Sequence, residues 1–454
     1  MALISVNPAT GEILREFRAW SADDVQKVVE KVHAAWREWR SVELTERSRL
    51  MSRLASTIRA QRDELSHIIT LEMGKPVTEA RAEVEKCATA CDYSAEHSAG
   101  FLSPEAIESD ASKSYVRFDP LGVILAVMPW NFPFWQVFRF AAPAMMSGNA
   151  VLLKHASNTS WCSLSIEGLF VQAGFPENVF RSILAGPALV PDVIRSRSVS
   201  GVTLTGSSAA GAAIGEVAGR SMKKSVMELG GSDPFIVLVD ADLDLAAEQA
   251  TLSRTLNCGQ SCIAAKRFIV ESSVADGFLE RFIERMHARV VGDPLSESTQ
   301  MGPMARRDLR DQLHGQVEES ERKGARVVLG GKLVEGPGAF YPPTVLTGVE
   351  AGMPAFDQEL FGPVASVIVA GSEDEALDLA NHTSFGLGAS LWTRDVGRAE
   401  NLAGRLEAGS VFINGMVKSD PRLPFGGIKE SGHGRELSVY GFREFVNIKT
   451  VWVR

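Results

Sequence analysis

The chain contains few cysteines and carries more acidic than basic side chains. Its 454 residues include five cysteines, Cys87, Cys91, Cys162, Cys258 and Cys262. These are too few for a disulfide framework, and their odd number leaves at least one thiol unpaired, so we expect a reducing, cytoplasmic location. Lys and Arg total 47 against 56 Asp and Glu, a net charge of −9. A protein with a net negative charge is poorly suited to neutralising the phosphate backbone of a nucleic acid. We therefore expect no nucleic-acid partner.

Long apolar runs are also scarce. Segment 120–138 carries no charge over about the span of a bilayer. However, Pro129 and Pro133 would break the backbone hydrogen bonding of a spanning helix, and Asn131 would bury an amide at its centre. The first dozen residues have neither the basic stretch nor the apolar core of a signal peptide. We therefore expect no membrane partner.

The composition is that of a globular protein, with 45% hydrophobic and 23% charged residues. After an opening strand, the first seventy or so residues have helical spacing, and Ser21 with Asp24 predicts a capping box. Short apolar runs then alternate with helical stretches, which is typical of a parallel sheet covered on both faces. The first series comprises 122–127, 150–154, 202–205 and 235–239. A second comprises 266–270, 327–330, 364–369 and 410–414. The sequence thus predicts two α/β domains.

Two further segments point to association between chains. Residues 107–119 are polar and interrupt the first domain, so they form either an ordinary loop or strands of an arm that pairs with another subunit. The tail from residue 441 alternates apolar and polar residues like an edge strand, for which a second chain is a natural partner. We expect a homodimer or a dimer-of-dimers tetramer.

Three residues have the chemistry for covalent catalysis, although each also has a structural explanation. Cys262, in NCGQSCIAA, is either a small buried hydrophobe or a nucleophile whose own backbone amide faces an oxyanion. Glu228 ends an apolar strand before two glycines, where burial would suit it to general base work; alternatively it caps or pairs structurally. Asn131, in PWNFP, is either a turn residue or an amide that donates to an oxyanion.

A strand-to-helix turn supplies a possible anion site. Gly206 and Ser207 follow an apolar strand and precede an Ala-rich helix, where backbone N–H groups can bind phosphate. The segment matches neither the GxGxxG nor the Walker A pattern. Lys154 ends a neighbouring strand and either reaches a ribose or phosphate or is a solvated strand end.

Together these segments resemble the aldehyde dehydrogenase superfamily over essentially the whole chain. The shared motifs are NPATGE, PWNFP, SGNAVLLK, TGS, ELGG, GQSC, ELFGPV (359–364), PFGG and SGHGRE (424–436). The resemblance implies a Rossmann-type cofactor domain, an α/β catalytic domain and a small β oligomerisation arm. The expected divisions are 1–106 with 120–229 for the cofactor domain, 230–430 for the catalytic domain, and 107–119 with 431–454 for the arm and tail.

The resemblance also implies roles for individual residues. Cys262 matches the nucleophile, Glu228 the general base, and Asn131 the side-chain half of the oxyanion hole. An aldehyde would be oxidised through a thiohemiacetal and a thioester, and the presence of Glu228 favours hydrolysis over transfer to coenzyme A. No metal is implied. The positions implied at a nicotinamide cofactor are Trp130, Asn131, Lys154, His155, Ala156, Ser157, Gly206, Ser207, Leu229, Glu359 and Phe361.

Within the superfamily, KHASN, ELGGSDPFIVL and GPMAR are most similar to short bacterial succinate-semialdehyde dehydrogenases. Arg139 and Ser419 match that branch's carboxylate pocket, and Arg139 lies about 12 Å past Asn131 if the segment is helical. Arg139 alternatively pairs with a neighbouring acid. A second arginine of some members is here Leu256.

These matches leave substrate and cofactor choice partly open. Lys418 or Arg422 replaces the missing arginine, or the site accepts less polar aldehydes. A dehydrogenase of broad specificity, or one for aromatic or aliphatic aldehydes, is thus an alternative. A catalytically silent ligand-binding protein is another, which the intact catalytic residues disfavour. Ser157 stands where NAD-preferring relatives often carry a glutamate, so we expect NADP to be used at least as well as NAD.

Cys258 is either a packed thiol or, one turn before Cys262, part of a redox switch.

Overall fold

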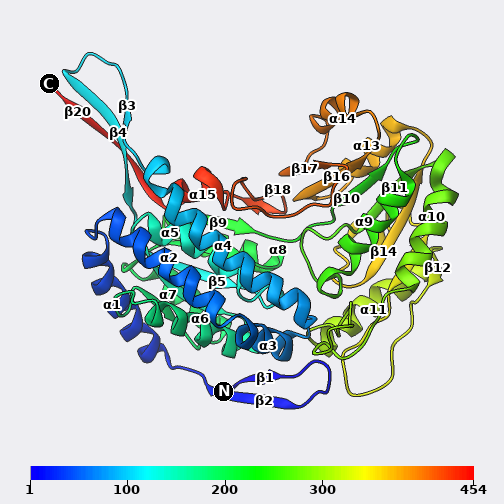
Figure 1. Ribbon diagram of the computed structural model, residues 1–454, viewed down its shortest axis with the longest axis horizontal. Helices are drawn as coiled ribbons and strands as arrows, with labels where there is room; N and C mark the ends of the chain where they lie inside the picture. The colour runs from blue at the N-terminus through cyan, green and yellow to red at the C-terminus, as the bar shows by residue number, and fades with distance from the viewer. Residues whose placement is uncertain (1) are drawn as a thin grey trace.

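The computed structural model describes residues 2–454, which form two α/β domains and a projecting strand arm (Figure 1). The expected α/β class is confirmed. Within these residues no helix has both the length and the apolar character needed to cross a membrane.

The first domain is built on a six-stranded sheet in the order β19-β9-β8-β5-β6-β7. Its strands run parallel except β19, which is antiparallel to β9. The strands are β5 (Val123–Met128), β6 (Ala150–His155), β7 (Phe180–Ser182), β8 (Val199–Thr205), β9 (Lys224–Glu228) and β19 (Gly432–His433). The helices are α1 (Ala22–Trp39), α2 (Leu44–Ala60), α3 (Arg62–Met73), α4 (Val77–Phe101), α5 (Trp135–Met146), α6 (Ser160–Gln172), α7 (Val190–Arg195), α8 (Ser208–Arg220) and α15 (Ser438–Glu444), with 3-10 turns η1 (Ser157–Thr159) and η2 (Pro187–Leu189).

Local sequence signals explain where the first helices begin and end. The Ser21 hydroxyl accepts the Asp24 N–H at 3.2 Å, and the Asp24 carboxylate accepts the Ser21 N–H at 3.1 Å, so the predicted capping box at α1 is confirmed. Gly74 ends α3 with a left-handed φ of 80°, a conformation that glycine adopts without a steric cost.

The second domain is built on a seven-stranded sheet in the order β12-β13-β14-β11-β10-β16-β17. Only β12 runs antiparallel to its neighbour within this described sheet. The strands are β10 (Pro234–Val237), β11 (Arg267–Glu271), β12 (Arg326–Leu329), β13 (Thr344–Thr347), β14 (Val364–Ala370), β16 (Gly388–Trp392) and β17 (Ser410–Ile413). The helices are α9 (Leu243–Thr255), α10 (Ser272–His287), α11 (Arg307–Arg322), α12 (Pro354–Asp357), α13 (Glu373–Asn381) and α14 (Val396–Ala403), with the turn η3 (Leu256–Gly259).

Short strand pairs complete the chain. Hairpin strands β1 (Ala2–Val6) and β2 (Ile13–Arg18) pair near the N-terminus, and β15 (Phe385–Gly386) pairs with β18 (Ile428–Lys429). The arm consists of β3 (Glu105–Ala106), β4 (Lys113–Pro120) and β20 (Val446–Val453), and it projects away from both domains at the upper left of Figure 1. Strand β20 lies at the edge of this sheet, as the alternating tail predicts.

Two sequence assignments differ from the structure. The run 235–239 was placed with the first series of strands, but β10 lies in the second sheet between β11 and β16. An apolar run does not identify its sheet, because buried strands of both domains have the same composition. The segment 431–454 is predicted as arm and tail, yet β19 joins the first sheet and α15 contacts α4 and α5. Of this segment, β20 is the part that belongs to the arm.

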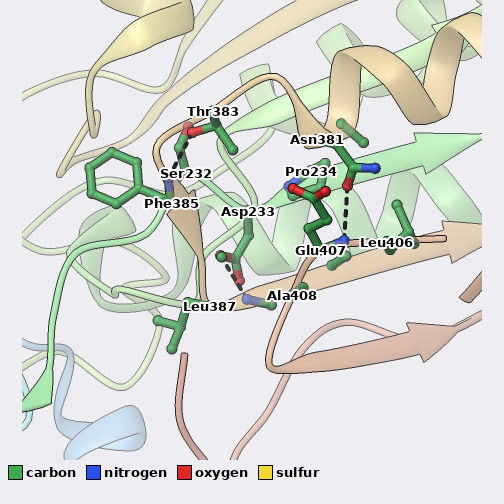
Figure 2. A pocket seen from close by; sticks show the side chains of 14 residues that line it. Ser232, Asp233, Pro234, Asn381, Thr383, Phe385, Leu387, Leu406, Glu407 and Ala408 are labelled. Carbon is green, nitrogen blue, oxygen red and sulfur yellow. Dashed lines mark hydrogen bonds between the residues drawn. The ribbon is translucent and has the colours of Figure 1, made fainter. Parts of the chain in front are cut away.

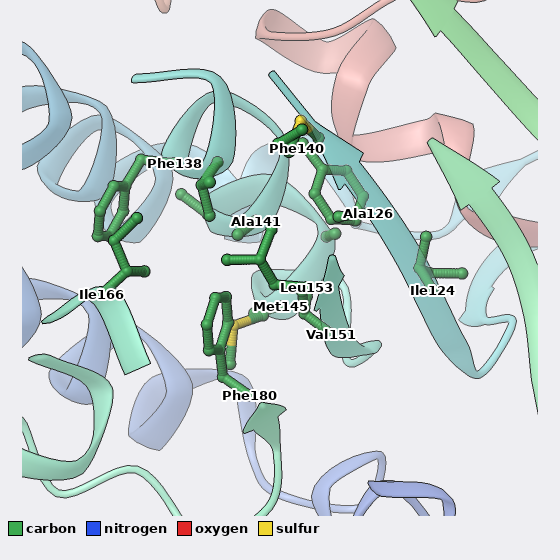
Figure 3. Packing of buried hydrophobic residues seen from close by; sticks show 14 of the residues in the cluster. Ile124, Ala126, Phe138, Phe140, Ala141, Met145, Val151, Leu153, Ile166 and Phe180 are labelled. Atoms are coloured by element: carbon green, nitrogen blue, oxygen red, sulfur yellow. The ribbon is translucent and has the colours of Figure 1, made fainter. Parts of the chain in front are cut away.

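The core of the first domain fixes α5 against the sheet. Side chains two residues apart on β5 and β6 pack against the inward face of α5, together with residues of α6 and β7 (Figure 3). The labelled members, all buried, are Ile124, Ala126, Phe138, Phe140, Ala141, Met145, Val151, Leu153, Ile166 and Phe180. Because α5 cannot shift without disturbing this packing, the segment before it, which contains Asn131, has a fixed position.

Candidate active site

Cys262 lies in a tightly bent loop after η3. Asn257, Cys258 and Gly259 have successive left-handed φ angles of 53°, 54° and 70°. The buried Lys266 ammonium ties the loop together by donating to the carbonyl oxygens of Ser261 (3.1 Å), Cys262 (2.8 Å) and Ala264 (3.2 Å). The position of the sulfur therefore depends on Lys266. The sequence alone does not single out Lys266, because a lysine at the start of a strand ordinarily indicates a solvated end.

Asn131 approaches the same loop from the start of α5. Gln136 Nε2 donates to Asn131 Oδ1 at 3.1 Å, and Asn131 Nδ2 donates to the Gln260 carbonyl at 3.1 Å. Asn257 Nδ2 holds the Asn131 main-chain carbonyl at 2.7 Å. These bonds fix the amide with its nitrogen toward the Cys262 loop, and the NH₂ group has a second hydrogen to donate. This orientation suits stabilisation of an oxyanion.

The environment of Cys262 disfavours a free thiolate in this state. Burial raises the pKa of the Cys262 thiol to about 12, while the Arg139 and Lys266 charges partly oppose the rise. The neighbouring carboxylates of Glu359 and Glu228 raise it further. The thiol proton must therefore leave as the sulfur attacks, and the charges beside it determine how easily it leaves.

Glu228 ends β9 and is buried at 2% exposure. Neither carboxylate oxygen has a hydrogen-bond partner within residues 2–454. The nearby Arg139 guanidinium, from α5, forms an ion pair with Glu436 and donates through Nη2 to Thr205 Oγ1 at 3.3 Å. Burial raises the pKa of Glu228 well above its usual value, Arg139 opposes the rise, and Glu436 adds to it. Arg139 is paired with Glu436 and not with Glu228, so its charge offsets only part of the effect of burial on Glu228.

One pocket extends from Cys262 between α4, α5 and the segment after β17, with a volume of about 580 Å³. The structure brings Arg139, Ser419 and Leu256 together in its wall. Ser419 Oγ accepts hydrogen bonds from Lys86 Nζ at 2.7 Å and from Trp135 Nε1 at 3.0 Å. Lys86 was missed because one lysine in a helical pattern carries no distinguishing signal. The full lining is Lys86, Phe132, Trp135, Gln136, Arg139, Ser253, Leu256, Ser261, Cys262, Ile263, Ala264, Met416, Val417, Lys418, Ser419 and Phe425.

A second pocket, of about 1060 Å³, meets the first at Cys262 and Gln136. The Trp130 and Phe361 rings in its wall meet edge to face, 5.7 Å between centroids. Glu359 Oε1 accepts the Gly231 N–H at 3.1 Å and lies 3.5 Å from Lys266 Nζ. The predicted residues that line this pocket are Trp130, Asn131, Gly206, Ser207, Leu229, Cys262, Glu359 and Phe361.

The wall of the second pocket fits a phosphate-bearing dinucleotide. Ser207 Oγ caps α8 by accepting the Ala210 N–H at 3.3 Å, and the positive end of this helix lies at the pocket. A Cβ at Gly211 would lie 2.5 Å from Leu229 Cδ1, so glycine is needed to keep Leu229 in the pocket wall. Helix α11 adds Leu309, Gln312 and Gln316. The sequence analysis missed these because their 3- and 4-residue spacing is indistinguishable from a solvated helix face.

The predicted residues 154–157 lie at the carboxyl end of β6 and do not line either pocket. Lys154 is 8% exposed, and no carboxylate pairs with it within the described chain. Burial lowers the pKa of Lys154. Both nitrogens of the His155 ring are hydrogen-bonded within the protein. Nε2 lies 2.8 Å from the Pro133 carbonyl oxygen and Nδ1 lies 2.8 Å from Thr159 Oγ1. Cofactor contacts by Lys154, His155, Ala156 and Ser157 stay predictions.

A third pocket, with room for about one water molecule, lies in the second domain around Asp233 and contains none of the predicted site residues (Figure 2). Asp233 Oδ1 accepts the Gly388 N–H at 3.1 Å, which joins the start of β10 to β16. Burial raises the pKa of Asp233 to about 7. This carboxyl group belongs to the scaffold under the Cys262 loop, since Lys266 N–H also bonds to the Asp233 carbonyl, at 3.1 Å.

The two neighbouring cysteines face different parts of the molecule. Cys258 is buried in a hydrophobic cluster of the second domain, whereas Cys262 packs against the cluster of the first. All five cysteines, which lie within the described residues, have free thiols. This packing favours the structural explanation of Cys258.

Comparisons with known proteins agree with the geometry. Residues 2–451 match the model of the Aldehyde dehydrogenase family. The chain is 48% identical over 453 residues to the probable succinate-semialdehyde dehydrogenase (NADP(+)) of Synechocystis sp., with 100% of both chains covered. It is 48% identical over 449 residues to the succinate semialdehyde dehydrogenase (NAD(P)+) of Escherichia coli, covering 99% of this chain and 97% of that protein. The structure of succinic semialdehyde dehydrogenase from Streptococcus pyogenes in complex with NADP+ has a TM-score of 0.97 at 37% identity, with 99% of each chain covered. The expected resemblance is confirmed, and the chain belongs to the aldehyde dehydrogenase family.

Proposed function

We propose that this protein oxidises succinate semialdehyde to succinate with NADP or NAD. The observation that carries the proposal is the lining of the pocket that reaches Cys262: three basic side chains, Lys86, Arg139 and Lys418, and no acidic one among the described residues. Such a pocket favours an aldehyde that carries a negative charge. The names of the Synechocystis, E. coli and S. pyogenes relatives support the same substrate.

The residues of the site account for the bond changes in order. Cys262 Sγ adds to the aldehyde carbon as its proton passes to water, and the Asn131 amide and the Cys262 N–H stabilise the thiohemiacetal oxyanion. Loss of a hydride from that carbon turns the thiohemiacetal into a thioester, and a nicotinamide held in the second pocket would be the hydride acceptor. Glu228 then removes a proton from water, the hydroxide attacks the thioester carbonyl, and the Cys262 sulfur leaves to give the acid.

The residues expected at the cofactor support the use of NADP. The N-terminus of α8 would hold the pyrophosphate, and Glu359 would face the nicotinamide side. Lys154 and Ser157 would contact the adenosine ribose; neither carries a negative charge, so nothing in this pair repels a 2′-phosphate. We therefore propose that NADP is preferred or used as well as NAD.

Assembly and location belong to the same proposal. Ile448 and Trp452 on edge strand β20 are 61% and 50% exposed, which is typical of a strand that a second chain covers. We propose a homodimer or a dimer-of-dimers tetramer in the cytoplasm. Light scattering on the intact chain and on a Trp452→Arg variant tests the arm, and an unchanged mass in the variant would count against its role.

A substrate panel tests the activity itself. NADPH and NADH formation would be followed with succinate semialdehyde, glutarate semialdehyde, butanal and benzaldehyde, with Cys262→Ala as the blank. We expect the highest kcat/KM with succinate semialdehyde. Equal or better turnover of butanal or benzaldehyde would instead support a broad-specificity enzyme, and no turnover with any of the four would support a silent binder.

A further inference from the structure

Lys86 carries a positive charge into the Cys262 pocket without an acidic partner. It extends from α4, lies over the Trp135 ring at 4.2 Å, and donates to Ser419 Oγ at 2.7 Å. Within residues 2–454 no carboxylate forms an ion pair with it. A half-buried ammonium without a counter-ion is unfavourable, and an anion in the pocket would relieve this cost.

The acids nearest to Lys86 are already occupied. Glu83, one turn earlier on α4, forms an ion pair with Lys75 and accepts the N–H groups of Phe134 and Trp135 at 2.9 and 3.0 Å. Asp420 accepts two bonds from the Arg422 guanidinium, at 2.8 and 2.6 Å, and these lower the pKa of its carboxyl to about 2. The positive charge of Lys86 is therefore available to a ligand.

Ser419 completes the arrangement. Its hydroxyl oxygen accepts from both Lys86 and Trp135, and its own proton has no acceptor among the described residues. The ammonium group keeps two further N–H donors. One O–H and two N–H groups beside each other in one pocket match the acceptor capacity of a carboxylate.

Arg139, which the family resemblance assigns to this role, is committed elsewhere. It is 2% exposed, and its charge is opposed by the ion pair with Glu436 and by the nearby Glu228. Lys418 lines the same pocket but is exposed and makes no bond to Ser419. Of the three basic residues, Lys86 is the one with both a free charge and a fixed position.

We propose that Lys86, together with the Ser419 hydroxyl, binds the substrate carboxylate and selects semialdehydes over uncharged aldehydes. This inference rests on the proposed function and names the residue that would carry its specificity. Because the carboxylate is remote from the reacting carbon, Lys86 acts on substrate binding and not on the bond-forming steps.

The charge state of Lys86 adds a pH dependence. Burial lowers the pKa of Lys86 to about 8, and Arg139 lowers it further, while Cys87, Glu83 and Asp420 raise it. Binding of a carboxylate favours the protonated form. The KM for succinate semialdehyde should therefore rise as the pH passes about 8, whereas the KM for butanal should not follow that change.

The test compares Lys86→Met with Lys418→Met, which removes the other lysine of the pocket, and with Lys86→Arg, which keeps a positive charge. We expect Lys86→Met to lower kcat/KM for succinate semialdehyde roughly 10- to 100-fold, mainly through KM, as expected for the loss of a charged hydrogen bond. The butanal value should not fall in parallel. Lys418→Met should lower the selectivity far less than Lys86→Met does, and Lys86→Arg should retain most of it.

Each outcome has a defined meaning. If the wild type prefers succinate semialdehyde and Lys86→Met keeps that preference, or if Lys418→Met loses it instead, the role of Lys86 is overturned while the proposed function stands. If the wild type shows no preference, both are overturned. If Lys86→Met fails to fold, as judged by its thermal melt, the wild-type pH profile decides: parallel KM profiles for succinate semialdehyde and butanal between pH 7 and about 9 would overturn the proposal.

Discussion

Arg139 on α5 and Glu436, in the segment between β19 and α15, form a buried ion pair close enough to Glu228, the proposed general base, to influence its pKa. Its members are 2% and 4% exposed, and they come from parts of the chain almost 300 residues apart in sequence. The positive charge of Arg139 therefore partly offsets the charges of two carboxylates, Glu436, which it contacts, and Glu228. This arrangement makes the charge of Arg139 a determinant of the protonation of Glu228.

Replacing Arg139 by Met should shift the pH dependence of thioester hydrolysis. Loss of the positive charge removes the larger of the two effects that lower the pKa of Glu228, so its base form should appear only at higher pH. The rising limb of the kcat profile should move upward in pH. The variant should also be less stable by about 3–5 kcal/mol, because Glu436 loses its buried partner. Arg139→Lys keeps the charge and is the control; an unmoved profile in Arg139→Met would contradict this role.

Replacing Glu228 by Gln should separate the two halves of the reaction. The thiol can still add to the aldehyde and be oxidised, but the carboxylate proposed to deprotonate water is gone. We expect a burst of about one NADPH per site, followed by a steady rate roughly 10²- to 10⁴-fold below wild type. Stopped-flow absorbance measures both phases. A wild-type steady rate in this variant would show that another group activates the water.

The sequence predicted the parts of the site that depend on local pattern. Asn131, Cys262, Glu359 and Phe361 lie in short motifs, and the structure brings all four to the second pocket. Asn131 follows the carboxyl end of β5 in the first sheet, whereas Cys262 precedes β11 and Glu359 precedes β14 in the second sheet, so the pocket lies where these strand ends of the two domains meet. The capping box at Ser21 is local in the same way.

What the sequence did not predict depends on contacts between distant segments. Lys86 and Lys266 are single lysines in ordinary helical or strand patterns, and their partners Ser419 and Glu359 lie 333 and 93 residues away. For Arg139 the sequence predicts, as one alternative, an ion pair with a neighbouring acid, but it does not identify Glu436 as that acid. No periodicity marks such residues, because their roles arise from packing between segments that are far apart in the sequence.

Replacing Lys266 by Met should loosen the Cys262 loop. Three carbonyl groups would lose their shared donor, and the thiol would lose one of the two positive charges that lower its pKa. We expect slower alkylation of Cys262 by iodoacetamide at a given pH and a lower kcat, with a loss of stability of about 1–3 kcal/mol. The exposed Lys323, directly after the last residue of α11, offers the matched control, Lys323→Met. Equal alkylation rates in the two variants would show that Lys266 does not affect the nucleophile.

Replacing Ser157 by Glu should change the preferred cofactor. Ser157 begins η1, three residues after Lys154, at the carboxyl end of β6. A carboxylate there would accept hydrogen bonds from the ribose hydroxyls of NAD and would repel the 2′-phosphate of NADP. We expect kcat/KM with NADP to fall roughly 10- to 100-fold while the NAD value is kept or improved. Ser157→Gln, which has a similar size but no charge, separates repulsion from steric exclusion. If the glutamate variant still used NADP at the wild-type rate, the 2′-phosphate would have to lie away from residue 157, and Lys154 would lose its expected role with it.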